Sequence, residues 1–491
     1  MELRKKVGLL FGPLFFLGAY FSPLLKENPK AHTLLAVFLL IVTWWITECI
    51  PIPITALLVP VLITVFRVTS VRDAFAPFAN PIIMLFLGSF ILAKAMSVHA
   101  LDQKLAHSIL SLKSIVQKKS RILFALGLTA VFLSMWISNT ATTAMMYPIV
   151  LGILGAFNSG NKENSVSSLN LIFLLMIAYS ASVGGVGTPI GSPPNLIAIG
   201  MLDRLADYKI TFFQWMVIGF LVLIPMYLAL FFFMKLKIRK EDISSRVRKD
   251  FSSAIKARPK GLTRPQRNVL VAFSVTVSLW TIPGLINLVF SILKKKPPLA
   301  LWLQEHFPES IAAIIGASLL FILPVNLKQG RFTLTLKEAL RIDWGTLLLF
   351  GGGLSLGFQM FETGLADSIG RFFISPETSA SLSLITLLSI TFSVFLTEVT
   401  SNTASANMII PIIIAISKAA SISPLAPVLG SAIGCSFAFM LPVATPPNAI
   451  IFGSGLVPLT KMIKYGFWLN IMGIIIIWVA IRLLAPLLGL I

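Results

Sequence analysis

Cysteine, histidine and acidic residues are scarce in this sequence. Its 491 residues include two cysteines, four histidines and 19 aspartates or glutamates. Cys49 and Cys435 both lie among apolar or small residues, so disulfides and thiolate metal sites have little support. The histidines stand at segment ends or in connections, and their spacing builds neither a zinc site nor a catalytic triad. Metal-dependent and triad-based hydrolases are therefore not expected.

Charge is scarce as well, whereas apolar residues are abundant. Charged residues make up 12% of the chain and hydrophobic residues 56%, in runs that recur from end to end. This composition predicts a polytopic membrane protein. The net charge of +21 would suggest nucleic-acid binding in a soluble protein, but here the cations lie mainly in connections, with few aromatic residues among them. We interpret them as determinants of topology and contacts with the lipid bilayer, and expect no nucleic-acid partner.

The apolar runs predict membrane-spanning helices of about 20 residues each. The first run follows Arg4-Lys5-Lys6 and lacks a small-residue cleavage site after it, so we expect a retained signal anchor. Continuous spans are predicted near residues 7–25, 31–50, 52–67, 80–98, 212–234, 269–292, 309–326, 344–361 and 466–489. With the two broken segments described below, about eleven transmembrane helices are expected in an all-α protein.

Two polar stretches interrupt these apolar runs. Residues 136–150 read WISNTATTAMMYPIV, and the apolar arms on either side, from 122 and to about 157, are each marginal for spanning. A polar tip between two short arms predicts a re-entrant helical hairpin. A near copy, TSNTASANMIIPI at 400–412, predicts a second hairpin over 381–419. In the copy, Ser401-Asn402-Thr403 stands 263 positions after Ser138-Asn139-Thr140.

Two further segments are predicted to be broken helices. Within 169–200, seven glycines and prolines fall between residues 184 and 194, which forbids a continuous helix and frees backbone groups that need partners. An extramembrane loop would also account for the glycines. It would not explain why the sequence SPPN at 192–195 returns as TPPN at 445–448, inside a second broken segment over 425–455. A broken helix at membrane depth is the usual place for a coupling ion or substrate.

The recurring motifs define one duplicated unit. Residues 80–106 match 344–370 loosely, with Gly88 on Gly352, so the repeat covers roughly 40–200 and 310–455. An odd number of predicted spans separates the copies, so the second copy should be inverted in the membrane. Inverted repeats place their binding site at the interface of the two copies, near the midplane.

The basic connections predict the orientation. Residues 235–267 hold twelve Lys or Arg against three acids, which predicts a cytoplasmic linker. The connection 99–121 and the N-terminus are then also inside, and the C-terminus is outside. Lys294-Lys295-Lys296 falls outside on this count, as an exception. We expect a multi-pass protein of the inner (cytoplasmic) cell membrane.

The chemistry of the polar stretches favours an anion held together with cations. No Lys, Arg or His lies in either SNT run or PPN segment. Positive potential would instead come from helix N-termini, from co-bound cations and from donors on Asn139, Thr140, Asn402, Thr403 and Thr445. Side-chain oxygens of Ser138, Asn139, Ser401 and Asn402, with freed carbonyls, are hard ligands suited to an alkali cation. A single such run could equally be an interhelical hydrogen-bonding patch, but its recurrence favours two cation sites around one anion.

Together these motifs carry a family resemblance. The paired SNT runs, GTPIGSPPNLI at 187–197 and CSFAFMLPVATPPNAII at 435–451 resemble the divalent anion/sodium symporter family, whose members transport di- and tricarboxylates or sulfate. The resemblance implies a homodimer with a scaffold and an elevator-like transport domain. It implies scaffold helices in 1–120 and 268–375, transport-domain halves in 121–234 and 376–491, and a cytoplasmic linker at 235–267.

The same resemblance implies the site residues. The first sodium site would use Ser134, Ser138, Asn139 and a carbonyl near Gly187, and the second Thr397, Ser401, Asn402 and Ala444. Substrate carboxylates would meet Asn139, Thr140, Asn402, Thr403, Thr445 and Pro446, with Ser138 and Ser401 beside them. This sequence departs from the family at Ser405-Ala406-Asn407 and at Ile451. Asn407 is expected to shift substrate preference, and Ile451 to change little.

These observations lead to a transport hypothesis with two rivals. We expect sodium-driven uptake of a divalent anion, with a C4-dicarboxylate such as succinate as the leading candidate over citrate or sulfate. The rivals are a sodium-independent dicarboxylate exchanger of the same fold and an anion channel. An intramembrane enzyme is not expected, because Glu48 and Glu398 are the main acids in the apolar segments and each stands where it would cap or anchor a helix.

Overall fold

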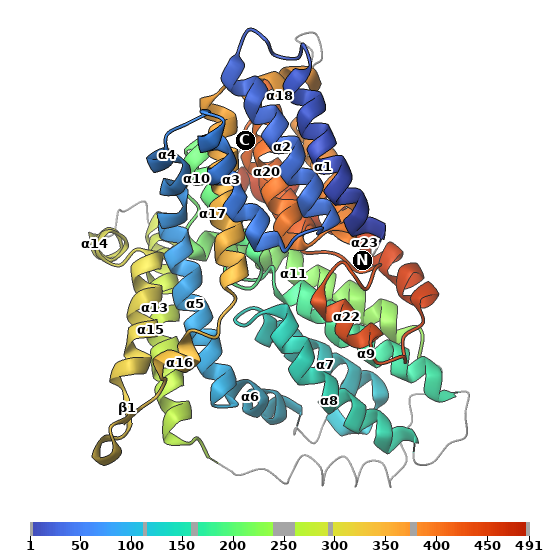
Figure 1. Ribbon diagram of the computed structural model, residues 1–491. Coiled ribbons are helices and arrows are strands. Elements are labelled where there is room, and N and C mark those ends of the chain that lie inside the picture. Colours follow the sequence, from blue (N-terminus) through green and yellow to red (C-terminus); the bar gives the residue numbers. More distant parts are fainter. Residues whose placement is uncertain are drawn as a thin grey trace.

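The computed structural model describes residues 3–110, 115–158, 165–238, 261–292, 298–373 and 381–487. The chain is helical almost throughout, as Figure 1 shows. A short antiparallel hairpin, β1 (Pro324–Asn326) and β2 (Arg331–Phe332), projects from one end, with Pro324 paired to Phe332. The run Lys294-Lys295-Lys296 and residues 239–260 of the basic linker lie outside the described residues. This architecture confirms the prediction of an all-α membrane protein.

The described residues up to 238 form eleven α-helices and two 3₁₀ turns. The helices are α1 (Leu3–Phe21), α2 (Pro29–Thr47), α3 (Ile52–Val65), α4 (Val71–Phe75), α5 (Pro81–Val98), α6 (Leu101–Leu110), α7 (Lys119–Ser134), α8 (Asn139–Asn158), α9 (Ser165–Gly184), α10 (Pro193–Ala206) and α11 (Phe212–Lys235). The 3₁₀ turns are η1 (Ala76–Ala79) and η2 (Ile115–Gln117).

The described residues from 261 onward are again mainly helical, with the β1–β2 hairpin between α15 and α16. The helices are α13 (Arg264–Ile292), α14 (Pro298–His306), α15 (Glu309–Ile322), α16 (Leu336–Ala339), α17 (Trp344–Glu362), α18 (Leu365–Phe373), α19 (Leu382–Val399), α20 (Asn402–Ala419), α21 (Leu425–Gly434), α22 (Pro446–Phe452) and α23 (Leu459–Leu487). A 3₁₀ turn, η3 (Leu327–Gln329), joins the two strands.

Several helices are long and apolar enough to cross a membrane. Among the described residues six qualify singly, and a seventh span arises if α14 and α15, which bend by 65° at their junction, are taken together. Shorter apolar helices occur at Ile52–Val65, Ser168–Gly184 and Leu425–Gly434. The last two are halves of the predicted broken helices. The predicted total of about eleven transmembrane helices stays a prediction.

Both predicted hairpins and both predicted breaks are present as helical elements. Helices α7 and α8 form one hairpin, and α19 and α20 form the other. The chain leaves helix between α9 and α10 and again between α21 and α22, where the glycines and prolines cluster. Helices α10 and α22 each begin with prolines in the first turn. Proline suits this position because the N–H group that it lacks would have no partner within the helix.

Glycines of the two copies make matching close contacts. Helix α5 packs against α15, and α3 packs against α17. A β-carbon at Gly88 would lie 2.6 Å from the backbone of Ala313, and one at Gly352 would lie 2.4 Å from the carbonyl oxygen of Ala56. Only glycine permits such close helix packing. Gly88 and Gly352 are the pair that the sequence alignment placed together, so the repeat extends to the packing of these helices.

The remaining helices form a second group around the hairpins. Helix α7 packs on α9 and α11, as α19 packs on α21 and α23, and α11 contacts α23. Helix α22 of the second copy contacts α8 and α9, while α10 of the first contacts α20 and α21. The half-helix after each break, α10 or α22, therefore packs against helices of the other copy. This packing brings the two breaks and the two hairpin tips into one region.

Candidate functional site

Each hairpin tip is shaped by a serine that caps the helix after it. Ser138 Oγ accepts a hydrogen bond from Ala141 N at 3.2 Å, and Ser401 Oγ accepts one from Ala404 N, also at 3.2 Å. Serine at this position satisfies a backbone donor that the first helical turn would leave unpaired. The capped helices, α8 and α20, therefore begin at the tips, with the positive ends of their dipoles there.

An asparagine follows each capping serine and is held by a hydroxyl from the preceding helix. Ser134 Oγ donates to Asn139 Oδ1, and Thr397 Oγ1 donates to Asn402 Oδ1 at 2.7 Å. Thr397 Oγ1 also lies 2.9 Å from the carbonyl oxygen of Cys435, at the end of α21. Each hydroxyl oxygen keeps lone pairs. When the hydroxyl proton rotates away from the amide oxygen, both oxygen atoms can coordinate a cation.

The asparagines of the PPN motifs satisfy the carbonyls that the broken helices free. Asn195 Nδ2 donates to the carbonyls of Gly185 at 2.9 Å and Thr188 at 2.8 Å. Asn448 Nδ2 donates in the same way to Ala438 at 2.9 Å and Leu441 at 3.1 Å. All side-chain atoms of both asparagines are buried. Each PPN asparagine therefore folds its break into a compact loop, and the sequence had indicated only that such partners must exist.

The first break approaches the first tip through glycines. A β-carbon at Gly185 would lie 2.7 Å from Asn139 Oδ1, and one at Gly191 would lie 2.9 Å from the carbonyl oxygen of Ser134. Gly187, which the resemblance implied, lies instead against side chains of Leu223 and Met135. The glycine beside Asn139 is therefore Gly185. The assignment of a carbonyl near Gly187 to sodium stays a prediction.

The second break is held by an acid. Glu398 is 3% exposed, and its Oε1 accepts from Phe439 N at 2.7 Å, Met440 N at 2.8 Å and Asn470 Nδ2 at 2.7 Å, while Oε2 accepts from Leu441 N at 3.0 Å. Four donors thus satisfy one buried carboxylate. Glu398 anchors the break, as the sequence suggested. Glu48 lies 3.7 Å from Arg4, which also donates to the carbonyl of Val399 at 2.8 Å, on the outer side of the second hairpin.

The two copies are joined directly between their breaks. Ser192 Oγ and Ser436 Oγ lie 2.8 Å apart, and both side chains are fully buried. Tyr179 on α9 donates from its hydroxyl to the carbonyl oxygen of Phe439 at 2.6 Å. These bonds cross the boundary between repeats, so the two breaks are fixed relative to each other.

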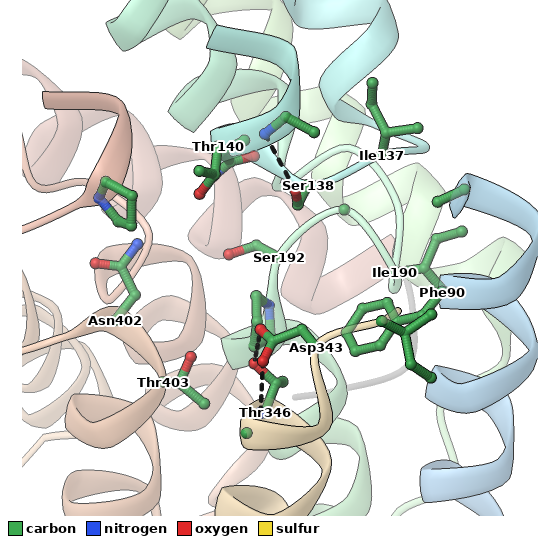
Figure 2. A pocket seen from close by; sticks show the side chains of 18 of the residues that line it. Phe90, Ile137, Ser138, Thr140, Ile190, Ser192, Asp343, Thr346, Asn402 and Thr403 are labelled. Atoms are coloured by element: carbon green, nitrogen blue, oxygen red, sulfur yellow. Dashed lines mark hydrogen bonds between the residues drawn. The ribbon is translucent and has the colours of Figure 1, made fainter. Parts of the chain in front are cut away.

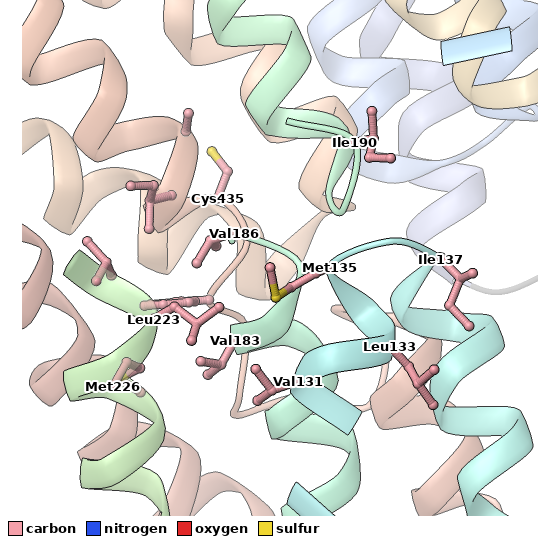
Figure 3. Close-up of a cluster of buried hydrophobic side chains, with 14 of the residues drawn as sticks. Val131, Leu133, Met135, Ile137, Val183, Val186, Ile190, Leu223, Met226 and Cys435 are labelled. Atoms are coloured by element: carbon pink, nitrogen blue, oxygen red, sulfur yellow. The ribbon is translucent and has the colours of Figure 1, made fainter. Parts of the chain in front are cut away.

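A cluster of buried apolar side chains packs beneath the first tip. Figure 3 shows Val131, Met135, Val183 and Val186 gathered under the loop between α7 and α8, with Cys435 of the other copy close by. Close packing of these side chains against one another holds the tip in place. The polar tip is therefore mounted on a rigid apolar base.

Both tips and both PPN motifs face one cavity of about 620 Å³ (Figure 2). Nine of the predicted site residues line it, namely Ser138, Asn139, Thr140, Ser401, Asn402, Thr403, Ala444, Thr445 and Pro446. Ser134 and Thr397 stand behind the asparagines, and Ser192 and Pro193 complete the first break. The volume falls within the range of about 300–1,000 Å³ that is usual for small-molecule sites.

Helices outside the hairpins form the opposite wall. Figure 2 shows Phe90 of α5 and Asp343 and Thr346 at the start of α17 facing the tip residues. Lys94 and Arg341 also line this wall. Sequence reasoning missed all of them, although a lysine inside the apolar run of α5 was a signal that could have pointed to an internal cavity.

The cavity extends toward one face of the molecule. Its lining includes Asp102 of α6 and Arg341 after α16, and both helices lie at the lower end in Figure 1, with β1. On the other side, α17 packs against α20 and α10, and no matching contact joins α5 to α8 or α22 among the closely packed described helices. The site is therefore open toward the α6 and α16 face and closed toward the other.

Of the departures noted in the sequence, Asn407 does not line the cavity. Its amide nitrogen donates to the Thr403 carbonyl at 3.0 Å, and its Oδ1 faces Gly353 of α17. Ile451 is fully buried in the apolar core of α22. The predicted influence of Asn407 on substrate preference would therefore have to act through Thr403.

Comparison with known proteins shows which family this chain matches. Residues 8–491 match the family described as the sodium:sulfate symporter transmembrane region. The chain is 34% identical over 506 residues to the sodium-dependent dicarboxylate transporter SdcS of Staphylococcus saprophyticus, covering 99% of this chain and 92% of that protein. It is 34% identical over 495 residues to SdcS of Staphylococcus aureus strain USA300, covering 98% and 91%.

Two further proteins resemble this chain, one in sequence and one in fold. An uncharacterized transporter of Haemophilus influenzae is 36% identical over 462 residues, covering 92% of each chain. The solved structure of MtrF from Neisseria gonorrhoeae matches with a TM-score of 0.55 at 15% identity, covering 98% of this chain and 94% of that one. The second similarity concerns the fold alone.

Proposed function

Because this chain belongs to the sodium:sulfate symporter family, we propose that it imports a C4-dicarboxylate such as succinate together with sodium ions. The family and the named relatives are transporters, which confirms the expectation that the chain is not an enzyme. The coarser function, sodium-coupled transport of a dicarboxylate or sulfate, follows from the family and these relatives.

The observation that carries the proposal is the matched pair of tips facing one cavity. Asn139 and Asn402 each receive a hydrogen bond from a hydroxyl five residues earlier, and each begins a helix at the cavity wall. Each tip thus offers oxygens on one side and amide and hydroxyl donors on the other. This is the donor set for a cation beside an anion.

Sodium supplies the charge that the tips lack. A dicarboxylate carries about two negative charges at neutral pH, and sodium at each tip would compensate them. At about 4 Å, opposite unit charges attract by about 4 kcal/mol at an effective dielectric constant of 20. Binding of cation and anion would therefore favour each other. Ser134, Asn139, Thr397 and Asn402 fit this role through their hard oxygen atoms.

The same geometry favours an alternating mechanism. The repeated packing of Gly88 and Gly352 supports an inverted repeat, with α3, α5, α15 and α17 as a scaffold and the hairpin group as the moving unit. The basic connections make the open face cytoplasmic. In this proposal the hairpin group moves as an elevator, and the described arrangement is its inward-open state. A homodimer through scaffold helices remains part of the proposal.

Uptake into proteoliposomes tests this function against its rivals. Purified protein is reconstituted, and radiolabelled succinate uptake is measured with an inward sodium gradient, an inward potassium gradient, and internal unlabelled succinate without sodium. A symporter accumulates succinate above the external concentration only with sodium. Stimulation by internal succinate alone indicates an exchanger, and flux that never exceeds equilibration indicates a channel. A competition panel of sulfate, malate, 2-oxoglutarate and citrate then defines the anion.

A further inference from the structure

Two cationic side chains line the same cavity as the tips. Lys94 lies in the last two turns of α5, and Arg341 lies between α16 and α17. Both lie on elements outside the two hairpins. The tips themselves contain no cationic side chain. The cavity therefore has a donor-rich wall without charged side chains and a wall where Lys94 and Arg341 stand together with Asp102 and Asp343.

The position of Lys94 is unusual for its helix. It is the single charged residue in α5, whose other 17 residues are apolar or small. A charged side chain inside an apolar helix is costly and commonly faces a water-filled cavity where it serves a function. Among the described residues Lys94 has no hydrogen-bond or ion-pair partner within contact distance. Its ammonium group is free to meet an anion in the cavity.

The carboxylates near these cations are already engaged. Asp343 caps α17, accepting from Thr346 N at 3.1 Å and Thr346 Oγ1 at 2.6 Å. Asp102 accepts from Gln103 N at 2.7 Å, and burial raises the pKa of this carboxyl above its usual value. Neither acid forms an ion pair with Lys94 or Arg341 among the described residues.

One more acid lies near Arg341. Glu338 on α16 accepts from Thr335 N at 2.9 Å and Thr335 Oγ1 at 2.7 Å in a capping box. Arg341 lies near enough to help lower the pKa of Glu338. Glu338 does not line the cavity, so the cavity side of Arg341 remains available to a ligand.

We propose that Lys94 and Arg341 form a second, weaker subsite for a dicarboxylate dianion, used on entry and release at the open face. The subsite rests on the proposed function, because it receives the same anion that the tips bind. A four-carbon dicarboxylate is small for a cavity of about 620 Å³, so it can occupy a position away from the tips. The ammonium and guanidinium groups attract a carboxylate at short range, although Asp102 and Asp343 line the same wall, and so speed its encounter with the site.

The proposal predicts an effect that depends on the face from which the anion comes. The cationic wall lines the cavity in the state open toward α6 and α16. An anion arriving from the other face meets the tips after the hairpin group has moved. Neutralising Lys94 or Arg341 should therefore weaken succinate binding at the α6 and α16 face and leave the opposite face unchanged.

Half-saturating succinate concentrations at the two faces test this prediction. Radiolabelled succinate uptake is measured in intact cells and in inside-out membrane vesicles, each with sodium on the side of entry, for Lys94→Gln and Arg341→Gln. Each substitution should raise the half-saturating concentration about threefold in vesicles, as expected for a solvent-exposed ion pair. Values in intact cells should stay unchanged. Added choline chloride should narrow the difference between the half-saturating concentrations of the wild type and the variants in vesicles, because salt screens the cationic side chains.

Control variants separate this role from a structural one. Lys94→Arg keeps the charge and should behave as wild type, and Lys337→Gln removes a charge on α16 that does not line the cavity. Unchanged half-saturation in vesicles, or equal shifts at both faces, would overturn the subsite. Should Lys94→Gln not fold, the exposed Arg341 provides the same comparison. Absence of sodium-driven succinate uptake in the wild type would instead overturn the proposed function.

Discussion

Asn407 of α20 occupies the space that a side chain on Gly353 of α17 would need. A β-carbon at Gly353 would lie 1.7 Å from Asn407 Oδ1, and both residues are buried. The contact belongs to the packing of α17 on α20, and neither residue lines the cavity. At the equivalent position of the first copy, Ser89 of α5 lines the cavity instead. The two copies therefore differ at this position, where Gly353 packs on Asn407 and Ser89 lines the cavity.

Substitution of Gly353 by alanine should disfavour the described state. The added methyl group would force Asn407 to move, at a cost of about 1–3 kcal/mol. We expect slower succinate uptake from Gly353→Ala, with recovery in the double variant Gly353→Ala/Asn407→Ala, because the shortened side chain makes room. A double-mutant cycle on initial uptake rates and on thermal unfolding in detergent measures this coupling. Additive effects of the two substitutions would contradict the contact.

The PPN asparagines should be needed for folding of the breaks. Asn195→Asp and Asn448→Asp keep the shape of the side chain but replace two donated hydrogen bonds by a carboxylate facing two carbonyls. Each lost hydrogen bond leaves a buried carbonyl oxygen without a donor, which lowers the stability of the fold by about 1–3 kcal/mol. We expect lower unfolding temperatures for both variants and little change for Asn326→Asp in β1, away from the site. Unchanged thermal stability of Asn195→Asp would show that the break does not depend on this amide.

Glu398 should act on transport through the loop that it anchors. Glu398→Gln retains one acceptor oxygen but turns an amide group toward backbone donors that now lack a partner. We expect reduced stability by about 1–3 kcal/mol and weaker sodium activation, because Thr397 bonds the carbonyl of Cys435 beside this loop. Glu305→Gln, on the exposed face of α14, which packs on α13, serves as the control. Wild-type stability and sodium activation in Glu398→Gln would exclude the anchoring role.

Two connections from the scaffold helices turn at corresponding residues. Ala100, before α6, has φ of 50°, and Gly364, before α18, has φ of 76°. Alanine in the left-handed region is strained by about 1–2 kcal/mol, whereas glycine is not. Gly364→Ala should therefore lower the unfolding temperature, while Ala100→Gly should not. A β-carbon at Gly364 meets Asn28 Nδ2 at an ordinary 3.4 Å, so the loss would come from the backbone. Equal behaviour of the two variants would refute this reasoning.

Local motifs made the tips and breaks predictable from sequence. The paired SNT runs, the clustered glycines and the PPN repeats are polar or helix-breaking features inside apolar surroundings, where each has few structural explanations. The spacing of the repeats also placed Gly88 and Gly352 in register, and their packing agrees with it. The helical nature of the chain, and nine site residues lining one cavity, follow from such features.

Contacts between distant segments were beyond the sequence. Nothing local indicates that Asn407 meets Gly353, that Gly185 rather than Gly187 approaches Asn139, or that Lys94 shares one cavity with the tips. Each depends on how helices of different groups pack, which a single chain without aligned relatives does not reveal. The number of spans and the inversion of the repeat likewise depend on a membrane that local sequence indicates only by hydropathy.

The most direct test of the account is the sodium-activation curve of succinate uptake by Asn139→Ala and Asn402→Ala in proteoliposomes. Each asparagine is assigned to a cation through Oδ1 and to the anion through its amide, so loss of either should raise both the half-maximal sodium concentration and the half-saturating succinate concentration, by roughly tenfold for about 1.4 kcal/mol. Ser134→Ala and Thr397→Val should raise the sodium value more than the succinate value, since these hydroxyls stand behind the asparagines. A change in the succinate value with an unaltered sodium curve in both asparagine variants would contradict the paired-tip site.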